Sequence, residues 1–146
     1  MTFKIIHHYQ KGKEMIAENI FKKLYLTPAQ KKLIVNAPRE YLDFLGDLQY
    51  DIAVDVKMEG VYDFVQIFAT TQAELEHLVK KYGKSGKYDC LFWGCYPKGG
   101  GKIKSDIKRD TVWTAFQLVE MHAVTQVSID DTWSALRARP LDTYKK

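Results

Sequence analysis

The spacing of apolar residues along the chain predicts helices and strands in alternation. Over 14–24 the apolar residues recur at helical spacing and form one stripe, made of Met15, Ile16, Ile20, Phe21 and Leu24. A second amphipathic helix is predicted over 71–82, where Thr71 and Glu74 have the spacing of a capping box. Short apolar runs bounded by turn residues predict strands over 31–37, 50–56, 61–69, 87–97, 123–130 and 132–139.

Proline, glycine and polar residues indicate where two further helices begin and end. The segment 37–46 has Pro38 near its first helical position and Gly46 just past its last, which suits the left-handed geometry of a helix end. In the segment 106–122, Ser105 or Asp106 is expected to cap a helix that ends at His122.

The order of these elements predicts an α/β fold. Strands that alternate with helices of ten or more residues need crossover connections, which give a largely parallel sheet with helices on both faces. The last two strands are close in sequence, around Asp130 and Asp131, and are expected to form an antiparallel hairpin at one edge. We therefore predict a three-layer Rossmann-like domain with a truncated methyltransferase-like layout. It spans 1–146, with a helical extension at 1–24 and a loose tail at 140–146.

Composition places this domain among globular proteins. The chain has 146 residues, of which 46% are apolar, enough for one hydrophobic core. No apolar run reaches the ~18–20 residues that span a bilayer, and the first residues lack the apolar region of a secretory signal. We expect a soluble cytoplasmic protein with no membrane partner. Cys90 and Cys95 lie an odd number of residues apart on one predicted strand, so they are expected on opposite faces as packing residues.

Charge is segregated along the chain although the net charge is only +4. Residues 1–39 carry eight basic and two acidic side chains, 40–79 carry one basic and nine acidic, and 80–110 carry nine basic and three acidic. Such blocks either steer an anionic ligand or form ordinary solvated surface. No recognised nucleic-acid-binding motif accompanies the basic residues, so no nucleic-acid partner is expected.

Ligands of open parallel α/β sheets bind beyond the carboxyl ends of the strands. The first such loop contains Asn36 and Pro38, and it has no glycine. A dinucleotide or S-adenosylmethionine site normally has a glycine-rich turn at this point, so we expect no standard cofactor. The chain also lacks the motifs of recognised nucleophile–base pairs, and no metal site is predicted.

A second loop, after the strand 87–97, is the stronger candidate for a binding site. Its glycines offer free backbone N–H groups, basic side chains surround them, and a predicted helix start follows; the candidate residues are Lys98, Gly99, Gly100, Ser105, Asp106 and Arg109. The loop is either a cradle for a small anionic ligand or a solvated connection. Asp106, Arg109 and Asp110 are expected to share one helix face near Lys98, either as a structural ion-pair cluster or as a site for a small zwitterion.

Several short motifs together resemble a family of short bacterial proteins that is classed as a domain of unknown function. The motifs are "LIVNAP", "DFVQIF", a strand ending in "WGCYPK", "SDIKRD" and "DDTWSALR". The resemblance covers roughly 24–139 and implies a Rossmann-like fold without an assigned activity. It points to Asn36, Ala37, Pro38, Pro97, Lys98, Ser105, Asp106, Arg109, Asp110, Thr132, Trp133 and Ser134.

Two functional hypotheses from different classes follow. The first is a non-catalytic regulatory or small-ligand-binding domain, favoured by the missing glycine turn. The second is a group-transfer enzyme of methyltransferase-like ancestry that uses the crevice near Asn36, Lys98 and Asp106. A third interpretation, an interaction module, has the helix 14–24 pairing with a partner or with a second copy to form a homo-oligomer.

Overall fold

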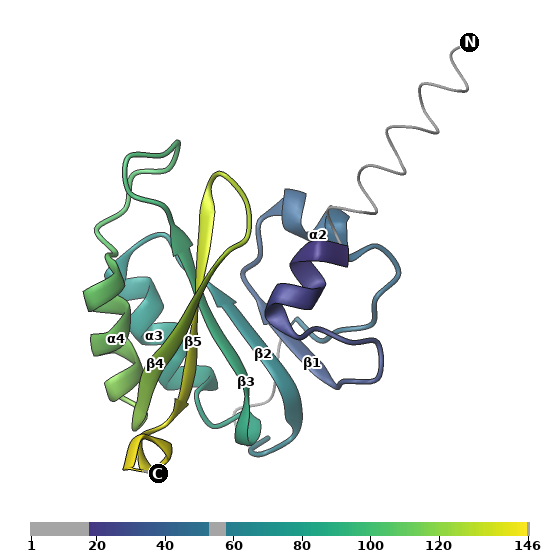
Figure 1. Ribbon diagram of the computed structural model, residues 1–146, viewed down its shortest axis with the longest axis vertical. Helices are drawn as coiled ribbons and strands as arrows, with labels where there is room; N and C mark the ends of the chain where they lie inside the picture. Colours follow the sequence, from purple (N-terminus) through teal and green to yellow (C-terminus); the bar gives the residue numbers. More distant parts are fainter. Residues whose placement is uncertain (1–17, 53–57, 146) are drawn as a thin grey trace.

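The computed structural model describes residues 18–52 and 58–145, and it contains one five-stranded sheet (Figure 1). The strand order is β1-β2-β3-β5-β4, with bounds Lys32–Val35, Tyr62–Phe68, Gly86–Pro97, Trp133–Pro140 and Met121–Ser128 in that order. β1, β2 and β3 pair in parallel, and β5 lies antiparallel between β3 and β4. Four of the five strands therefore point the same way, and the predicted α/β class with its antiparallel edge hairpin is confirmed.

Helices cover both faces of the sheet and complete the three layers. α3 (Gln72–Tyr82) and α4 (Arg109–Gln117) lie side by side on one face (Figure 1). Their apolar stripes pack with the sheet in a first core that includes Leu75, Val79, Val112 and Phe116. Burial of these side chains against the sheet is what stabilises helices of this length.

The second core lies on the other face, under α2 (Arg39–Leu45) and the helical segment 18–24. Ile20 and Leu24 of that segment are buried in it, so the described part of the N-terminal stripe packs within the chain. The segment ends in a Schellman motif: the N–H groups of Tyr25 and Leu26 donate to the carbonyls of Lys22 and Phe21, at 3.2 and 2.9 Å. Tyr25 there has a φ of +59°.

A buried polar pair links α2 to the sheet within this core. The Tyr41 hydroxyl donates to Oε1 of Gln66 at 2.7 Å, and Nε2 of Gln66 contacts Sγ of Cys95 at 3.4 Å. Phe68 and Trp133 stack edge to face beside this pair, with ring centroids 5.2 Å apart. The three adjacent strands and α2 are thus tied together by polar as well as apolar contacts.

Most boundaries predicted from the sequence agree with the structure. Pro38 occupies the N-cap of α2, and Gly46 follows its last residue with a φ of +55°. At α3, Thr71 Oγ1 accepts from the Glu74 N–H, which is one half of the predicted capping box, whereas Glu74 Oε1 accepts from the Thr70 N–H and not from that of Thr71. Cys95 lies in the second core whereas Cys90 packs against the first, so the two free cysteines lie on opposite faces as expected.

The segment 106–122 differs from its prediction. α4 begins only at Arg109 and ends at Gln117, because Lys108 forms the N-cap by exchanging hydrogen bonds with Thr111. Glu120 then takes a φ of +59° and turns the chain into β4, where His122 pairs with Arg139. Ser105 and Asp106 therefore do not cap this helix, and His122 does not end it.

Two other predicted segments need comment. The strand predicted over 50–56 falls mostly outside the described residues; Asp51 forms an isolated parallel bridge with Leu33. The tail expected to be loose forms a 3-10 turn, η1 (Leu141–Lys145). No helix among the described residues is long and apolar enough to cross a membrane.

Candidate functional site

The carboxyl ends of the three parallel strands meet at one edge of the sheet, called the carboxyl rim below. Val35 is in register with Ile67, and Phe68 with Cys95, so the loops after β1, β2 and β3 start side by side. The candidate residues predicted from the sequence were expected at this rim, and the strands do share this edge.

Asn36 fastens the first two strands together at the carboxyl rim. Its backbone has a φ of +62°, and its side-chain amide donates to the Phe68 carbonyl at 2.9 Å. Asparagine tolerates this left-handed conformation better than most residues. Pro38 follows at the N-cap of α2 and has no N–H to offer a ligand. Both residues therefore serve the local structure of the β1–α2 turn.

The start of α3 is occupied by the side chains of the chain itself. Asp106 Oδ1 accepts from the Gln72 N–H at 2.8 Å, and Glu74 Oε1 accepts from the Thr70 N–H at 2.9 Å. Thr71 Oγ1 takes the Glu74 N–H at 3.2 Å. The amides and the positive end of a helix dipole, which suit an anion, are thus already bound to two carboxylates and a hydroxyl.

Lys98 faces away from the start of α4. Its N–H donates to the Thr132 carbonyl at 2.8 Å, and its ammonium donates to Ser128 Oγ at 2.6 Å, so both contacts reach the β4–β5 hairpin. The glycines after it form a turn, in which Gly100 has a φ of +75° and Gly101 N–H donates to the Lys98 carbonyl at 3.2 Å.

The predicted cluster of Lys98, Asp106, Arg109 and Asp110 is therefore corrected. Asp106 lies before α4 in non-helical backbone and does not share a helix face with Arg109. Among the described residues the ion pairs are Lys87–Asp63 and Arg139–Asp89, neither of them in this cluster. Ser105 accepts the Ile107 N–H at 3.0 Å, which stabilises the extended approach to the helix.

Arg109 instead borders a groove between α4 and the edge strand β4. The groove has a volume of about 410 Å³ and is lined by Arg109, Asp110, Trp113, Ala123, Val124 and Leu136. Trp113 is 43% exposed there, so it does not pack wholly into the core.

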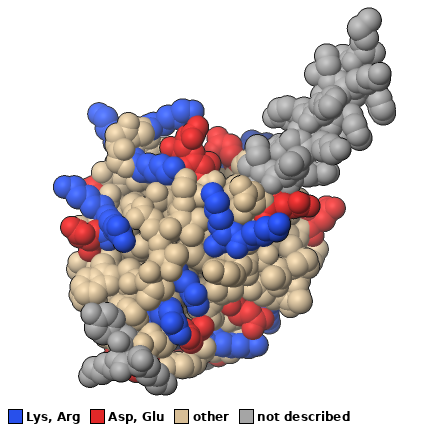
Figure 2. Space-filling model, viewed as in Figure 1, with Lys and Arg blue, Asp and Glu red and all other residues tan. Residues whose placement is uncertain are grey.

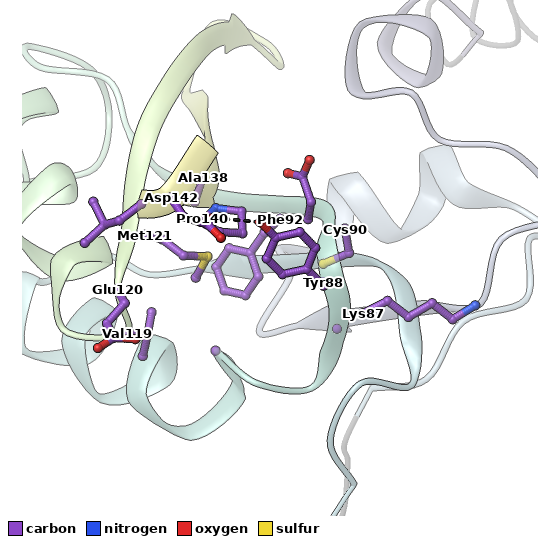
Figure 3. Close-up of a pocket in the computed structure, with 14 residues that line it drawn as sticks. Lys87, Tyr88, Cys90, Phe92, Val119, Glu120, Met121, Ala138, Pro140 and Asp142 are labelled. Atoms are coloured by element: carbon purple, nitrogen blue, oxygen red, sulfur yellow. Dashed lines mark hydrogen bonds between the residues drawn. The ribbon is translucent and has the colours of Figure 1, made fainter. Parts of the chain in front are cut away.

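A larger cavity of about 530 Å³ lies at the opposite edge of the sheet (Figure 3). It is enclosed by the amino ends of β3 and β4, the carboxyl end of β5 and η1, and we call it the amino-end cavity. Its lining residues are Gly83, Gly86, Lys87, Tyr88, Asp89, Cys90, Phe92, Val119, Glu120, Met121, Ala138, Pro140, Leu141 and Asp142. None of them was a sequence-predicted site residue, because only the fold brings together the three stretches 83–92, 119–121 and 138–142.

Polar contacts surround the amino-end cavity. The Tyr88 hydroxyl donates to the Asp142 carboxylate at 2.7 Å, and this hydrogen bond raises the pKa of Tyr88 (Figure 3). Arg139 donates to both carboxylate oxygens of Asp89, at 2.9 and 2.6 Å, and holds the pKa of that carboxyl below its usual range. Burial raises the pKa of the Cys90 thiol to about 12, so it is protonated at neutral pH and is a poor nucleophile.

Side chains of both charges are present on one face of the folded chain. On the face shown in Figure 2, acidic and basic side chains lie interspersed around a broad uncharged area. This face therefore presents no single-sign field of the kind that steers a charged ligand. Within 18–52 and 58–145 no group of three or more His, Cys, Asp or Glu residues is placed to hold a metal ion.

Comparisons with known proteins bear on the fold. No protein-family model matches the sequence, and no curated protein matches it. Among solved structures, the [4+2]-cyclase SpnF has a TM-score of 0.58 at 8% identity, over 88% of this chain and 81% of that one.

Two further structures are similar to the same extent. A SAM-dependent methyltransferase from Aquifex aeolicus has a TM-score of 0.55 at 10% identity, over 84% of this chain and 88% of that one. The PH0226 protein from Pyrococcus horikoshii OT3 has a TM-score of 0.56 at 10% identity, over 90% and 91%. At these identities the likeness concerns the fold alone, and the chain has a Rossmann-like fold of the methyltransferase type.

Proposed function

We propose that the protein is a non-catalytic small-ligand-binding or regulatory domain that has a methyltransferase-type fold without a standard cofactor site. The observation that supports this most is the start of α3, where Asp106 and Glu74 already accept the hydrogen bonds of backbone N–H groups. A phosphate or carboxylate arriving at that point has to displace a carboxylate of the protein. Hydrogen bonds to charged groups contribute about 1.5–3 kcal/mol each, and an incoming anion gains only the excess of its own hydrogen bonds over those that it displaces.

The turn after β1 supports the same proposal. A cofactor that lies close to this turn needs a backbone without side chains, and the turn here is Asn36, Ala37 and Pro38. The Asn36 amide is held by the Phe68 carbonyl, which fixes the side chain across the end of the two strands. Fold likeness by itself does not decide function, and the similar structures include a [4+2]-cyclase as well as methyltransferases.

A ligand panel tests the proposal. The full chain is heated with S-adenosylmethionine, nucleotides and sugar phosphates, and the unfolding temperature is compared with that of the free protein. A ligand at a hundredfold excess over its Kd stabilises the folded state by ~2.7 kcal/mol, which such an assay detects readily. We expect no shift that depends on the carboxyl rim. The matched variants are Lys98→Ala at the rim and Lys84→Ala, an exposed lysine far from it along the chain.

One alternative has an observation of its own. The likeness to a SAM-dependent methyltransferase favours a group-transfer enzyme that binds an anionic or nucleotide-like ligand at the strand carboxyl ends. A shift with S-adenosylmethionine or a nucleotide that is lost in Lys98→Ala and kept in Lys84→Ala would support this enzyme and overturn the non-catalytic proposal.

A further inference from the structure

The amino-end cavity has the size and the walls of a small-molecule site. Its volume of about 530 Å³ falls within the ~300–1,000 Å³ of ligand pockets. Phe92, Met121 and Ala138 form apolar walls and are 2%, 8% and 1% exposed, so they belong to the core and are held in place by it. These three residues make a fixed floor, and a ligand with an apolar body can bury surface against Tyr88 and Leu141, which also line the cavity and are 67% and 41% exposed.

The rim of this cavity is acidic. Three lining side chains are carboxylates, Asp89, Glu120 and Asp142, and one is a cation, Lys87. Lys87 is engaged elsewhere: its ammonium pairs with Asp63 at 2.8 Å, and in Figure 3 its side chain extends away from the other labelled residues.

Two of the three carboxylates have no cationic partner in the described part of the chain. Asp89 is neutralised by Arg139, whereas Asp142 accepts only from the neutral hydroxyl of Tyr88, and Glu120 is exposed. The Leu141 N–H donates to the Glu120 carbonyl at 2.9 Å, which holds the segments of Glu120 and Asp142 next to each other. Among the side chains that the structure describes, the uncompensated charge that lines the cavity is therefore negative.

Two aromatic residues of the amino-end cavity also favour a cationic ligand. Tyr88 and Phe92 both line the cavity and are labelled in Figure 3. Aromatic faces attract cations, with a contribution of about 0.5–2 kcal/mol that grows as water is excluded. Tyr88 is 67% exposed, so its ring is available to an incoming ligand, and Phe92 is buried beneath.

We propose that the amino-end cavity binds a small amine, with its apolar or aromatic body against Tyr88 and Leu141 above this floor and its ammonium group near Glu120 and Asp142. The inference rests on the proposed small-ligand-binding function, since it names the ligand class and the site. The ligand proposed for this cavity is a cation, whereas the basic loop after β3 predicted an anion. The charged groups around this cavity repel anions. The amine competes with the Tyr88 hydroxyl for the Asp142 carboxylate.

Calorimetric titration of the full chain uses three probes that share a phenyl ring and a two-carbon chain and differ in the charge of the polar group. It therefore separates the effect of ligand charge on affinity from the effect of ligand shape. The probes are 2-phenylethylamine, 2-phenylethanol and phenylacetate, with hexylamine as an aliphatic amine of similar length. We expect both amines to bind, the alcohol to bind about two- to tenfold more weakly than its amine, and the carboxylate not to bind.

Two charge variants locate the site. Glu120→Gln and Asp142→Asn keep the side-chain shape and are each expected to weaken amine binding by about two- to tenfold, while Glu40→Gln, an exposed glutamate of α2, leaves it unchanged. Far-ultraviolet circular dichroism confirms that each variant is folded. The inference is overturned if neither amine binds, if the alcohol binds as well as the amine, or if both cavity variants bind like Glu40→Gln. Binding of S-adenosylmethionine that depends on the carboxyl rim, by contrast, would count against the proposed function and leave the amine result intact.

Discussion

Removing the Tyr41 hydroxyl tests the buried polar pair that joins α2 to β2. Tyr41 and Gln66 are 3% and 0% exposed, and the hydroxyl donates to Oε1 of Gln66 at 2.7 Å. Burial raises the pKa of Tyr41, so the hydroxyl remains a donor at neutral pH. Tyr41→Phe leaves the Gln66 oxygen buried without a donor. Because an unsatisfied buried acceptor costs about 1–3 kcal/mol, the free energy of unfolding should fall by that amount.

A double-mutant cycle sharpens this prediction. Gln66→Leu alone leaves the Tyr41 hydroxyl without its acceptor and is expected to cost a similar ~1–3 kcal/mol. With both substitutions, neither partner is left unsatisfied, so the double variant should lose at least ~1 kcal/mol less than the sum of the two single losses.

Urea unfolding followed by tryptophan fluorescence measures each free energy, and unchanged m-values show that the folded and unfolded states keep their compactness. Tyr82→Phe is the matched control: Tyr82 is 6% exposed, and its hydroxyl makes no hydrogen bond to a described residue, so its loss should stay within ~0.5 kcal/mol. Strictly additive losses, with an interaction energy under ~0.3 kcal/mol, would refute the assigned hydrogen bond.

Three further predictions concern backbone strain, pH and close packing. Tyr25→Gly should raise the free energy of unfolding by about 0.5–1 kcal/mol in urea titrations, because glycine adopts the left-handed C′ conformation without strain; a loss of stability would contradict this. The stability difference between wild type and Asp89→Asn should be constant above about pH 5 and shrink as pH falls below about 4, because a carboxyl whose folded pKa is lowered stabilises only when ionised; a difference that stays constant below about pH 4 would contradict this. Gly86→Ala should lower the thermal midpoint of unfolding, because the added Cβ atom would clash with Sγ of Cys90. Combining it with Cys90→Ala removes the clashing sulfur and should recover part of the loss. No recovery would show that the clash with Cys90 is not the cause.

The spacing of apolar and capping residues predicted most of the helices and strands, because each of these elements is determined largely by residues close together in the chain. The apolar run 61–69 became β2, and the Thr71 cap with the apolar stripe of the following segment became α3. The loops after β1 and β3 could be placed on one rim because parallel strands share their carboxyl edge. The start of α4 was misplaced because Asp106 has the composition of a cap, yet its carboxylate serves the Gln72 N–H of a different helix.

The binding sites were harder to predict, for a physical reason. Lys98 contacts Ser128, and Asp106 contacts Gln72, which are partners 30 and 34 residues away. Charge spacing within one loop cannot reveal such partners, so the predicted ion-pair cluster was wrong. The amino-end cavity likewise depends on three stretches of the chain that meet only after the sheet is complete, and its lining residues Tyr88 and Asp142 are 54 residues apart.

The place of β5 within the sheet has a consequence for the order of assembly. β5 follows every other strand in the chain but sits between β3 and β4, and β4 has no other strand partner among the described residues. On a ribosome, β4 therefore emerges before anything exists for it to pair with, and the first core stays open on that flank until Trp133–Pro140 arrives. Chains that end before Trp133 should expose the β3 edge and recruit chaperones or aggregate, whereas chains in which Trp133–Pro140 has left the ribosome can close the sheet in one step.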